Sequence, residues 1–302
     1  MSLIERAAQR LEELRKSGAA LKPLSNMPPR SAIPIDVPKE RDNAPQATTP
    51  HSEPAKTTKR FFEIDFSDLG KRGFITPDMQ RSRVAEEFRV IKRPLIQNAV
   101  NRPARPLKNG NLIMVTSAVP GEGKTFTSIN LALSIVSELN KTVLLVDADV
   151  ARPSLPNVLG IPTGPGLMDL LDDPATDMAD VLLRTNIDNL NLLSSGNPHA
   201  RATELLASDA MSRLLDNMAS RYPDRIVIFD SPPLLVTTES RELARHAGQV
   251  VVVVHAESTL QADVKRALAT IEQCPVKLLV LNQARTLAQG AYGYGYGYGY
   301  GR

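Results

Sequence analysis

The residues best suited to chemistry are gathered in the stretch 117–125, which reads Ser-Ala-Val-Pro-Gly-Glu-Gly-Lys-Thr. It follows an apolar run at 112–116 and precedes a run with apolar residues at helical spacing, 127–139. A strand, a Gly-rich turn and a helix N-terminus direct backbone N–H groups at one point, which suits a phosphate group. Lys124 would lie along the β- and γ-phosphates of a nucleotide, and the Thr125 hydroxyl would bind Mg²⁺.

This phosphate loop departs from the usual pattern G-x-x-x-x-G-K-[ST], because Ala118 stands where the first Gly is expected. The assignment therefore depends on the flanking strand and helix, and the alternative is an ordinary strand-to-helix turn. The residues predicted to contact the nucleotide here are Pro120, Gly121, Glu122, Gly123, Lys124, Thr125 and Phe126.

Three acidic residues end predicted strands close to this loop. Asp147 and Asp149 follow the apolar run at 142–146, and Asp230 ends the run at 226–229. Ligands of an open α/β sheet bind at the carboxyl ends of its strands, and an apolar run closing on Asp is a usual Mg²⁺ anchor. We predict Asp147 as the proton acceptor, and Asp149 and Asp230 as holders of the metal and its waters. The alternative for Asp147 and Asp149 is a pair of turn-forming acids.

The remaining chain supplies the elements that position these residues. Most of the predicted strands are short apolar runs between helices, which indicates an α/β fold with a mostly parallel sheet and helices on both faces. The predicted strands are 112–116, 142–147, 190–194, 226–230, 249–254 and 277–282, and the predicted helices are 127–139, 201–221, 239–246 and 259–273.

Both ends of the chain differ from this alternating pattern. Residues 1–16 predict an amphipathic helix, 17–60 a disordered Pro-rich linker, and 286–302 a disordered Gly/Tyr tail, which leaves 61–285 as the folded domain. Within that domain, 61–70 predicts a short edge strand or clamp. A helix is expected at 81–100, and Pro94 should kink it or end its first part.

Composition limits the function classes. Net charge is +3, and ten Lys or Arg stand against three acids in 71–108; we interpret this excess as a solvated helix face, in preference to a nucleic-acid or membrane surface. One Cys excludes an intramolecular disulfide and suits a reducing compartment. The sequence has no run of 18 apolar residues and no apolar signal-peptide core. The expected location is the cytoplasm.

The phosphate loop, Asp-x-Asp and Asp-Ser-Pro-Pro together resemble the motifs of bacterial tyrosine kinases (BY-kinases), which belong to the Min/Par-like superfamily of P-loop NTPases. Partition ATPases of that superfamily carry a signature Lys where this chain has Val119. The spacing of Glu86, Arg89 and Lys92 resembles the oligomerisation helix of the kinases. The tail resembles their autophosphorylated tyrosine cluster, here Tyr292, Tyr294, Tyr296, Tyr298 and Tyr300.

This resemblance implies an ATP- and Mg²⁺-dependent protein-tyrosine autokinase that regulates exopolysaccharide biosynthesis and export. It implies catalysis by Lys124, Asp147, Asp149 and Asp230, Mg²⁺ binding by Thr125, Asp149 and Asp230, and adenine contact by Asn282. The family usually reads Asp-x-Asp-x-Arg; this chain has Ala151 at the fifth position, with Arg152 next. Arg152 is the candidate replacement.

The segment Val-Asp-Ala-Asp-Val-Ala-Arg-Pro and the long Pro-rich N-terminus resemble those of kinases from exosortase-linked (PEP-CTERM-type) exopolysaccharide gene clusters. The implied partners are a second copy bound through 81–100, a separate membrane chain-length determinant (polysaccharide co-polymerase) and a protein-tyrosine phosphatase, with no nucleic acid. The chain would then lie peripherally at the inner face of the cell membrane. The alternatives are a partition-type ATPase switch that positions a partner on membrane or DNA, and a scaffold with an adhesive tail.

Overall fold

The computed structural model describes residues 60–79, 81–100, 107–221 and 224–284. The predicted helix at 1–16, almost all of the Pro-rich linker and the tail at 286–302 lie outside the described residues. Their assignments remain predictions from the sequence.

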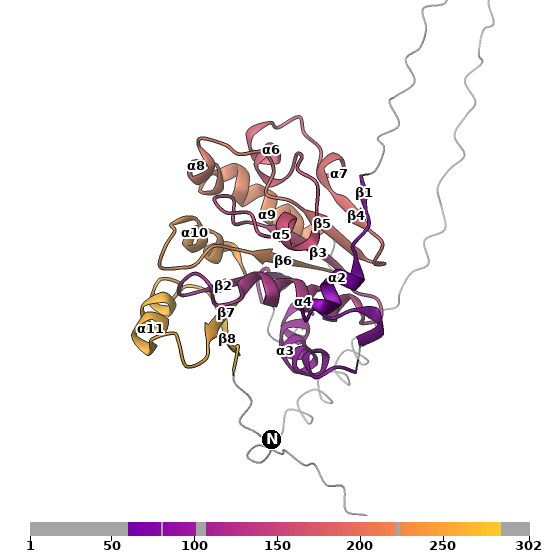
Figure 1. Cartoon of the computed structure of the whole chain (residues 1–302). Helices are drawn as coiled ribbons and strands as arrows, with labels where there is room; N and C mark the ends of the chain where they lie inside the picture. Colours follow the sequence, from indigo (N-terminus) through magenta and orange to yellow (C-terminus); the bar gives the residue numbers. More distant parts are fainter. Residues whose placement is uncertain (1–59, 80, 101–106, 222–223, 285–302) are drawn as a thin grey trace, which may run out of the picture. The chain divides into compact units, whose positions relative to one another are not determined.

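The described strands form one sheet, in the order β1-β4-β5-β3-β6-β2-β7-β8 (Figure 1). Neighbouring strands run parallel except for the pair β4 and β5, which is antiparallel. The phosphate-loop strand β2 lies between β6 and β7, so the carboxyl ends of central strands meet at one edge. The strands are β1 (Phe61–Phe62), β2 (Leu112–Ser117), β3 (Thr142–Asp147), β4 (Leu183–Thr185), β5 (Leu190–Leu193), β6 (Arg225–Asp230), β7 (Gln249–His255) and β8 (Val276–Asn282).

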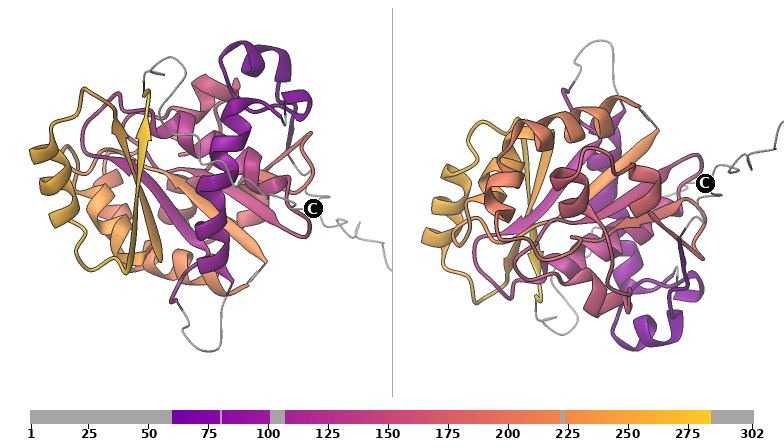
Figure 2. Two further views of the ribbon diagram at one scale, coloured as in Figure 1. Left: turned by 90° about the horizontal axis from the view of Figure 1, so that it is seen from below. Right: turned by 90° about the horizontal axis from the view of Figure 1, so that it is seen from above.

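Helices cover both faces of this sheet. Successive residues of a strand point to opposite sides, so each central strand contributes side chains to two apolar cores. In β2, Ile113 and Val115 join one apolar core, whereas Leu112 and Met114 join the other. The first core is closed by α2 (Phe66–Lys71), α3 (Arg83–Ala99), α4 (Lys124–Val136) and α5 (Leu155–Leu159). The second is closed by α6 (Leu167–Asp172), α7 (Met178–Val181), α8 (Ala202–Leu206), α9 (Asp209–Arg221), α10 (Glu239–His246) and α11 (Gln261–Ala269). Figure 2 shows α3 in front of the sheet from below, and the orange helices in front of it from above.

The predicted sheet is confirmed, and each of the six predicted strands agrees with an observed strand to within one residue. The helix predicted at 201–221 is wrong as a single element, since it is split into α8 and α9. Ser208 causes the break: its hydroxyl donates to the Leu205 carbonyl and accepts from the Met211 amide, so it caps the second helix.

Other boundaries also differ from the predictions. The prediction of an edge strand over 61–70 holds only for β1, because Asp65 accepts hydrogen bonds from the amides of Ser67 and Asp68 and starts α2. Helix α3 continues through Pro94. Helix α4 starts and ends three residues earlier than predicted, α11 is shorter than predicted, and a 3₁₀ turn at Pro77–Met79 precedes α3.

Candidate active site

The phosphate loop connects the end of β2 to the start of α4 and depends on two glycines with left-handed backbone. Gly121 has φ +83° and Gly123 has φ +91°. A Cβ on Gly123 would lie 2.1 Å from the side-chain nitrogen Nδ2 of Asn282, whereas one on Gly121 would meet open space. The left-handed φ therefore favours glycine at 123, and a Cβ there would also displace the Asn282 side chain.

The N-terminus of α4 is available for an anion. Gly123 is its N-cap, no side chain caps it, and its first turn contains no acidic residue. Its free N–H groups and helix dipole both favour negative charge. Lys124 and Thr125 form the first turn and add a cation and a hydroxyl, so the residues present fit a nucleotide phosphate.

Asp230 at the end of β6 is joined to this helix by two hydroxyl groups. Thr125 Oγ1 donates to Asp230 Oδ2 at 2.7 Å, and Ser128 Oγ donates to Asp230 Oδ1 at 3.0 Å. Burial raises the pKa of Asp230 to about 6, although the two hydroxyl groups and the charge of Lys124 act in the opposite direction. A hydroxyl and a buried carboxylate thus lie side by side, which suits a hard cation with oxygen ligands.

Asp147 lies opposite Asp230 in the pairing of β3 with β6. It has no exposed surface. Its two carboxylate oxygens accept from the amides of Asp149 at 3.2 Å and Leu155 at 3.0 Å. Burial, and then the negative charge of Asp230, raise the pKa of Asp147 to about 8. Asp147 therefore organises the turn after β3 as well as carrying a carboxyl group at the site.

Asp149 is half-buried and is the more accessible acid of the Asp-x-Asp pair. Burial raises its pKa, against the Arg152 amide and the positive charges of Lys124 and Arg152. The Arg152 amide donates to Asp149 Oδ1 at 3.2 Å. Although Ala151 occupies the position where the family has Arg, the charge of Arg152 still acts on Asp149.

Glu122 has a role that sequence reasoning missed. Its side chain is 1% exposed. It accepts from the amides of Val119 at 2.8 Å and His255 at 3.3 Å, and from the Thr259 hydroxyl. It therefore fastens the loop to the end of β7, and only its backbone remains for the predicted nucleotide contact. A Glu inside a Gly-rich loop was the sole signal in the sequence.

Two further residues, Asn282 and Phe126, are predicted to contact the nucleotide. Asn282 Nδ2 donates to the Glu122 carbonyl at 2.9 Å, so Asn282 lies beside the loop, and its contact with adenine remains a prediction. For Phe126, only the backbone remains for the predicted nucleotide contact. Its ring packs against Phe74 at 5.0 Å and Phe88 at 6.4 Å between centroids, because it points into the core under α3. Its side chain does not face a nucleotide.

Comparison with known proteins gives the family. A model of the AAA domain matches residues 110–283, more than half of the chain. The tyrosine-protein kinase YwqD of Bacillus subtilis is 30% identical over 225 residues, which cover 74% of this chain and 91% of that protein. The chain belongs to the bacterial tyrosine-protein kinases.

The chain is also similar to other kinases of this family. Wzc of Salmonella typhimurium is 34% identical over 60% of this chain, but the match spans only 25% of the Salmonella protein. The crystal structure of the chimerical protein CapA2B2 matches with a TM-score of 0.58 and 27% identity, over 72% of this chain and 92% of that one. Membership of this kinase family decides against the partition-type ATPase.

Among the described helices, none is both long and apolar enough to cross a bilayer.

The predicted oligomerisation residues of this kinase do not share one outward face. Glu86 is exposed and pairs with Arg89, which is half-buried, whereas Lys92 is buried. Three residues turn a helix by about 300°, so two such steps leave Lys92 about 120° from Glu86. The Lys92 ammonium donates to the Ser134 carbonyl at 2.6 Å and pairs with Glu138 at 2.7 Å. The expectation that Lys92 faces a neighbouring subunit is therefore wrong for this structure.

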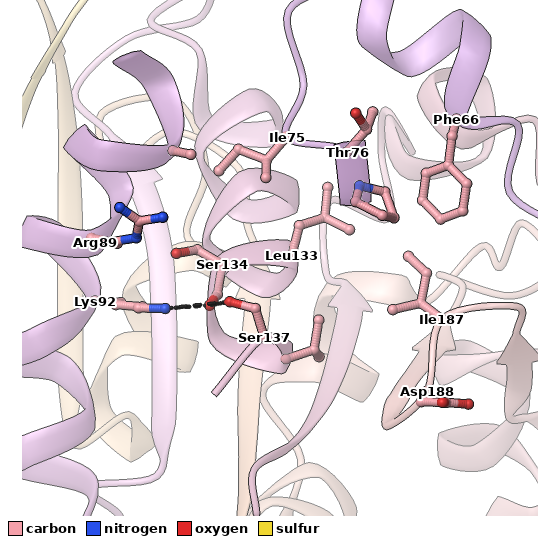
Figure 3. A pocket seen from close by; sticks show the side chains of 13 residues that line it. Phe66, Ile75, Thr76, Arg89, Lys92, Leu133, Ser134, Ser137, Ile187 and Asp188 are labelled. Carbon is pink, nitrogen blue, oxygen red and sulfur yellow. Dashed lines mark hydrogen bonds between the residues drawn. The ribbon is translucent and has the colours of Figure 1, made fainter. Parts of the chain in front are cut away.

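A hollow of about 230 Å³ lies beside Lys92 (Figure 3). Its wall includes Arg89 from α3, Ser134 from the C-terminal half of α4, Ser137 at the C-cap of that helix, and Ile187. The phosphate loop precedes the N-terminus of α4, so this hollow is separate from the nucleotide cradle. The lining is largely apolar, and its two cations are paired with Glu86 and Glu138.

Proposed function

We propose that this kinase transfers phosphate from ATP to tyrosines of its own C-terminal cluster, Tyr292, Tyr294, Tyr296, Tyr298 and Tyr300. The observation that carries the proposal is the contact of Thr125 with Asp230, which brings a phosphate-loop hydroxyl to a buried carboxylate beside an uncapped helix. The family membership supplies the reaction class, protein-tyrosine phosphorylation. The clustered tyrosines supply acceptors within the same chain.

The metal would be held by Thr125, Asp230 and, through water, Asp149. No cluster of three or more His, Cys, Asp or Glu that could hold a metal occurs in the part of the chain that the structure describes, so phosphate oxygens and waters would complete the coordination. When bound, Mg²⁺ neutralises charge on the β- and γ-phosphates. Lys124 would hold the transferring group in position and stabilise its negative charge, and such positioning supplies most of the catalysis in phosphoryl transfer.

The tyrosine proton needs an acceptor, since an unperturbed phenol has a pKa near 10. The sequence predicts Asp147 as the acceptor, and its raised pKa suits a base near neutral pH. Its lack of exposed surface and its two backbone contacts favour Asp149 instead. We propose Asp149 as the group that contacts the phenol, and Asp147 as the residue that positions the turn carrying it.

We further propose that the kinase regulates exopolysaccharide synthesis and export. This rests on the motif resemblance described above. The proposal includes a separate membrane chain-length determinant as partner, a phosphatase that resets the tail, and a position at the inner face of the membrane. Co-purification with a chain-length determinant from the same gene cluster, lost on deletion of residues 1–20, would support the partner assignment.

The enzymatic proposal is tested by expressing three proteins in bacteria and measuring phosphotyrosine in the C-terminal peptide by mass spectrometry. Lys124→Met removes the charge beside the transferring phosphate, and the C-terminal peptide should contain no phosphotyrosine. Lys265→Met is a matched control on the exposed surface of α11, and it should be phosphorylated like the wild type. Equal phosphotyrosine in a folded Lys124→Met protein would refute the assignment.

A further inference from the structure

The last strand of the sheet presents an open edge. In the described residues, β8 pairs with β7 on one side and has no strand on the other. Its residues alternate in exposure: Leu278 and Val280 pack against the core, while Leu279 is 56% and Leu281 65% exposed. The pairing with β7 sets Leu279 beside Val252 on the sheet face covered by α11. A row of free backbone groups therefore lies next to an exposed apolar strip.

Such an edge is unusual without protection. Natural edge strands are kept short, bulged, proline-containing or charged, because they otherwise pair with another strand. The strand β8 has seven residues, no proline and a single charged side chain, Lys277. Its backbone and the two leucines together offer what an added strand requires, which is main-chain partners and a surface for alternate side chains.

The sequence that follows β8 has a matching pattern. Tyr and Gly alternate strictly from Tyr292 to Tyr300. A period of two places every tyrosine on one face of an extended strand. Residues 283–291 connect the two segments, and nine residues are more than the two to five that most hairpin loops need. The tail can therefore return along the strand from which it leaves.

We propose that the segment 292–300 adds to the open edge of β8 as an antiparallel strand. Residues opposite each other in an antiparallel pair share a face. The tyrosine rings would then cover Leu279 and Leu281, and the glycines would occupy the other face. The tail would thereby protect the edge and bury the two exposed leucines.

This docked tail would hold its tyrosines on the leucines of the sheet edge, away from the strand that carries Asp230. The added strand would be the fourth neighbour of β6, in the order β6-β2-β7-β8-tail. At about 4.8 Å per strand spacing, it would lie roughly 19 Å from the strand that carries Asp230. The contact would store the acceptor tyrosines, and they would have to leave β8 before transfer.

Amide hydrogen exchange, resolved by residue with NMR, tests the proposal. The Lys124→Met chain is used so that the tail carries no phosphate, which makes the result independent of the proposed kinase activity. We expect those β8 amides that do not donate to β7 to exchange at least tenfold more slowly in this full chain than in the same chain without residues 291–302.

Two substitutions in the full Lys124→Met chain complete the test. Leu279→Asp places a charge in the exposed strip, and exchange should rise to the rate of the truncated chain. Val236→Asp is the matched control, since Val236 is 61% exposed and follows β6, and protection should persist. Equal exchange in full and truncated chains would overturn the proposal. Protection that survives truncation and rises with protein concentration would also overturn it, because a second copy would then cover the edge.

Discussion

The Thr125 hydroxyl donates a hydrogen bond to Asp230, with 2.7 Å between Oγ1 and Oδ2, across 105 residues of sequence. This contact joins the first turn of α4 to the end of β6 and defines where a metal ion would meet the phosphates. The same carboxylate also accepts from Ser128, so each of its two oxygens has one hydrogen bond from α4. Since a carboxylate has about four acceptor sites, lone pairs remain for a metal ion beside these two contacts.

Asp230→Asn removes the negative charge and keeps the side-chain size. We expect nucleotide affinity in the presence of Mg²⁺ to fall at least tenfold, while affinity measured in EDTA changes little, because the lost interaction is with the metal. Isothermal titration calorimetry with and without Mg²⁺ measures both. Ser220→Ala, on the exposed surface of α9, is a control that should change neither. An equal loss in both conditions would argue against a metal role for Asp230.

Asp147 predicts how stability depends on pH in the absence of nucleotide. Its pKa is raised to about 8 in the folded protein, from an ordinary value of 3.8. Between these values the folded state binds the extra proton, so the free energy of unfolding falls as pH rises, by about 1.4 kcal/mol per pH unit for one proton. The stabilising effect is fully present below pH 3.8 and is lost as pH passes about 8.

Urea unfolding at pH 6.5 and 7.5 checks this slope. Asp147→Asn should flatten it, whereas Asp188→Asn, an exposed acid before β5, should leave it unchanged. Asp230, whose pKa is raised to about 6, also titrates at the lower end of this interval, so the loss of slope in Asp147→Asn is the measure of Asp147. A slope that persists in Asp147→Asn would show that another group titrates there.

Glu122 should act on nucleotide binding through the loop that it fastens. Glu122→Gln keeps the size of the side chain but weakens its three acceptor contacts, since charge-assisted hydrogen bonds are about twice as strong as neutral ones. We expect KM for ATP to rise several-fold with a smaller change in kcat, and Thr259→Val to act in the same direction. Thr270→Val, at the end of α11, is the matched control. A loss confined to kcat would place Glu122 in the chemistry instead.

The outward part of α3 should mediate assembly without Lys92. Arg89→Glu reverses a charge that pairs with Glu86. We expect the particle mass measured by light scattering to decrease. Lys92→Met should instead lower the melting temperature, because it leaves Glu138 and the Ser134 carbonyl without their cation. A wild-type protein that is monomeric at every concentration would exclude this interface.

The sequence predicts the sheet well because its strands are continuous apolar runs that end at turn residues, and parallel strands bring Asp147 and Asp230 to one edge. The short helices α5 to α7 were missed, since four to six residues are too few to show a helical period. The burial of Lys92 could not be predicted, because lysine is almost always exposed. Its partners Ser134 and Glu138 lie on another part of the chain. The contact of Glu122 with Thr259 could not be predicted either, because the two residues are far apart in the sequence and meet only when β7 is placed beside the loop.

The most direct test of the kinase assignment is transfer of phosphate from ATP to the tail in a purified system. The full chain, treated with a phosphatase and repurified, is incubated with Mg²⁺ and ATP labelled at the γ-phosphate, and the phosphorylated residues are mapped by mass spectrometry. We expect label on tyrosines within 292–300, and none in Lys124→Met protein treated in the same way. Hydrolysis of ATP with no label on these tyrosines, or equal labelling of the Lys124→Met chain, would contradict it.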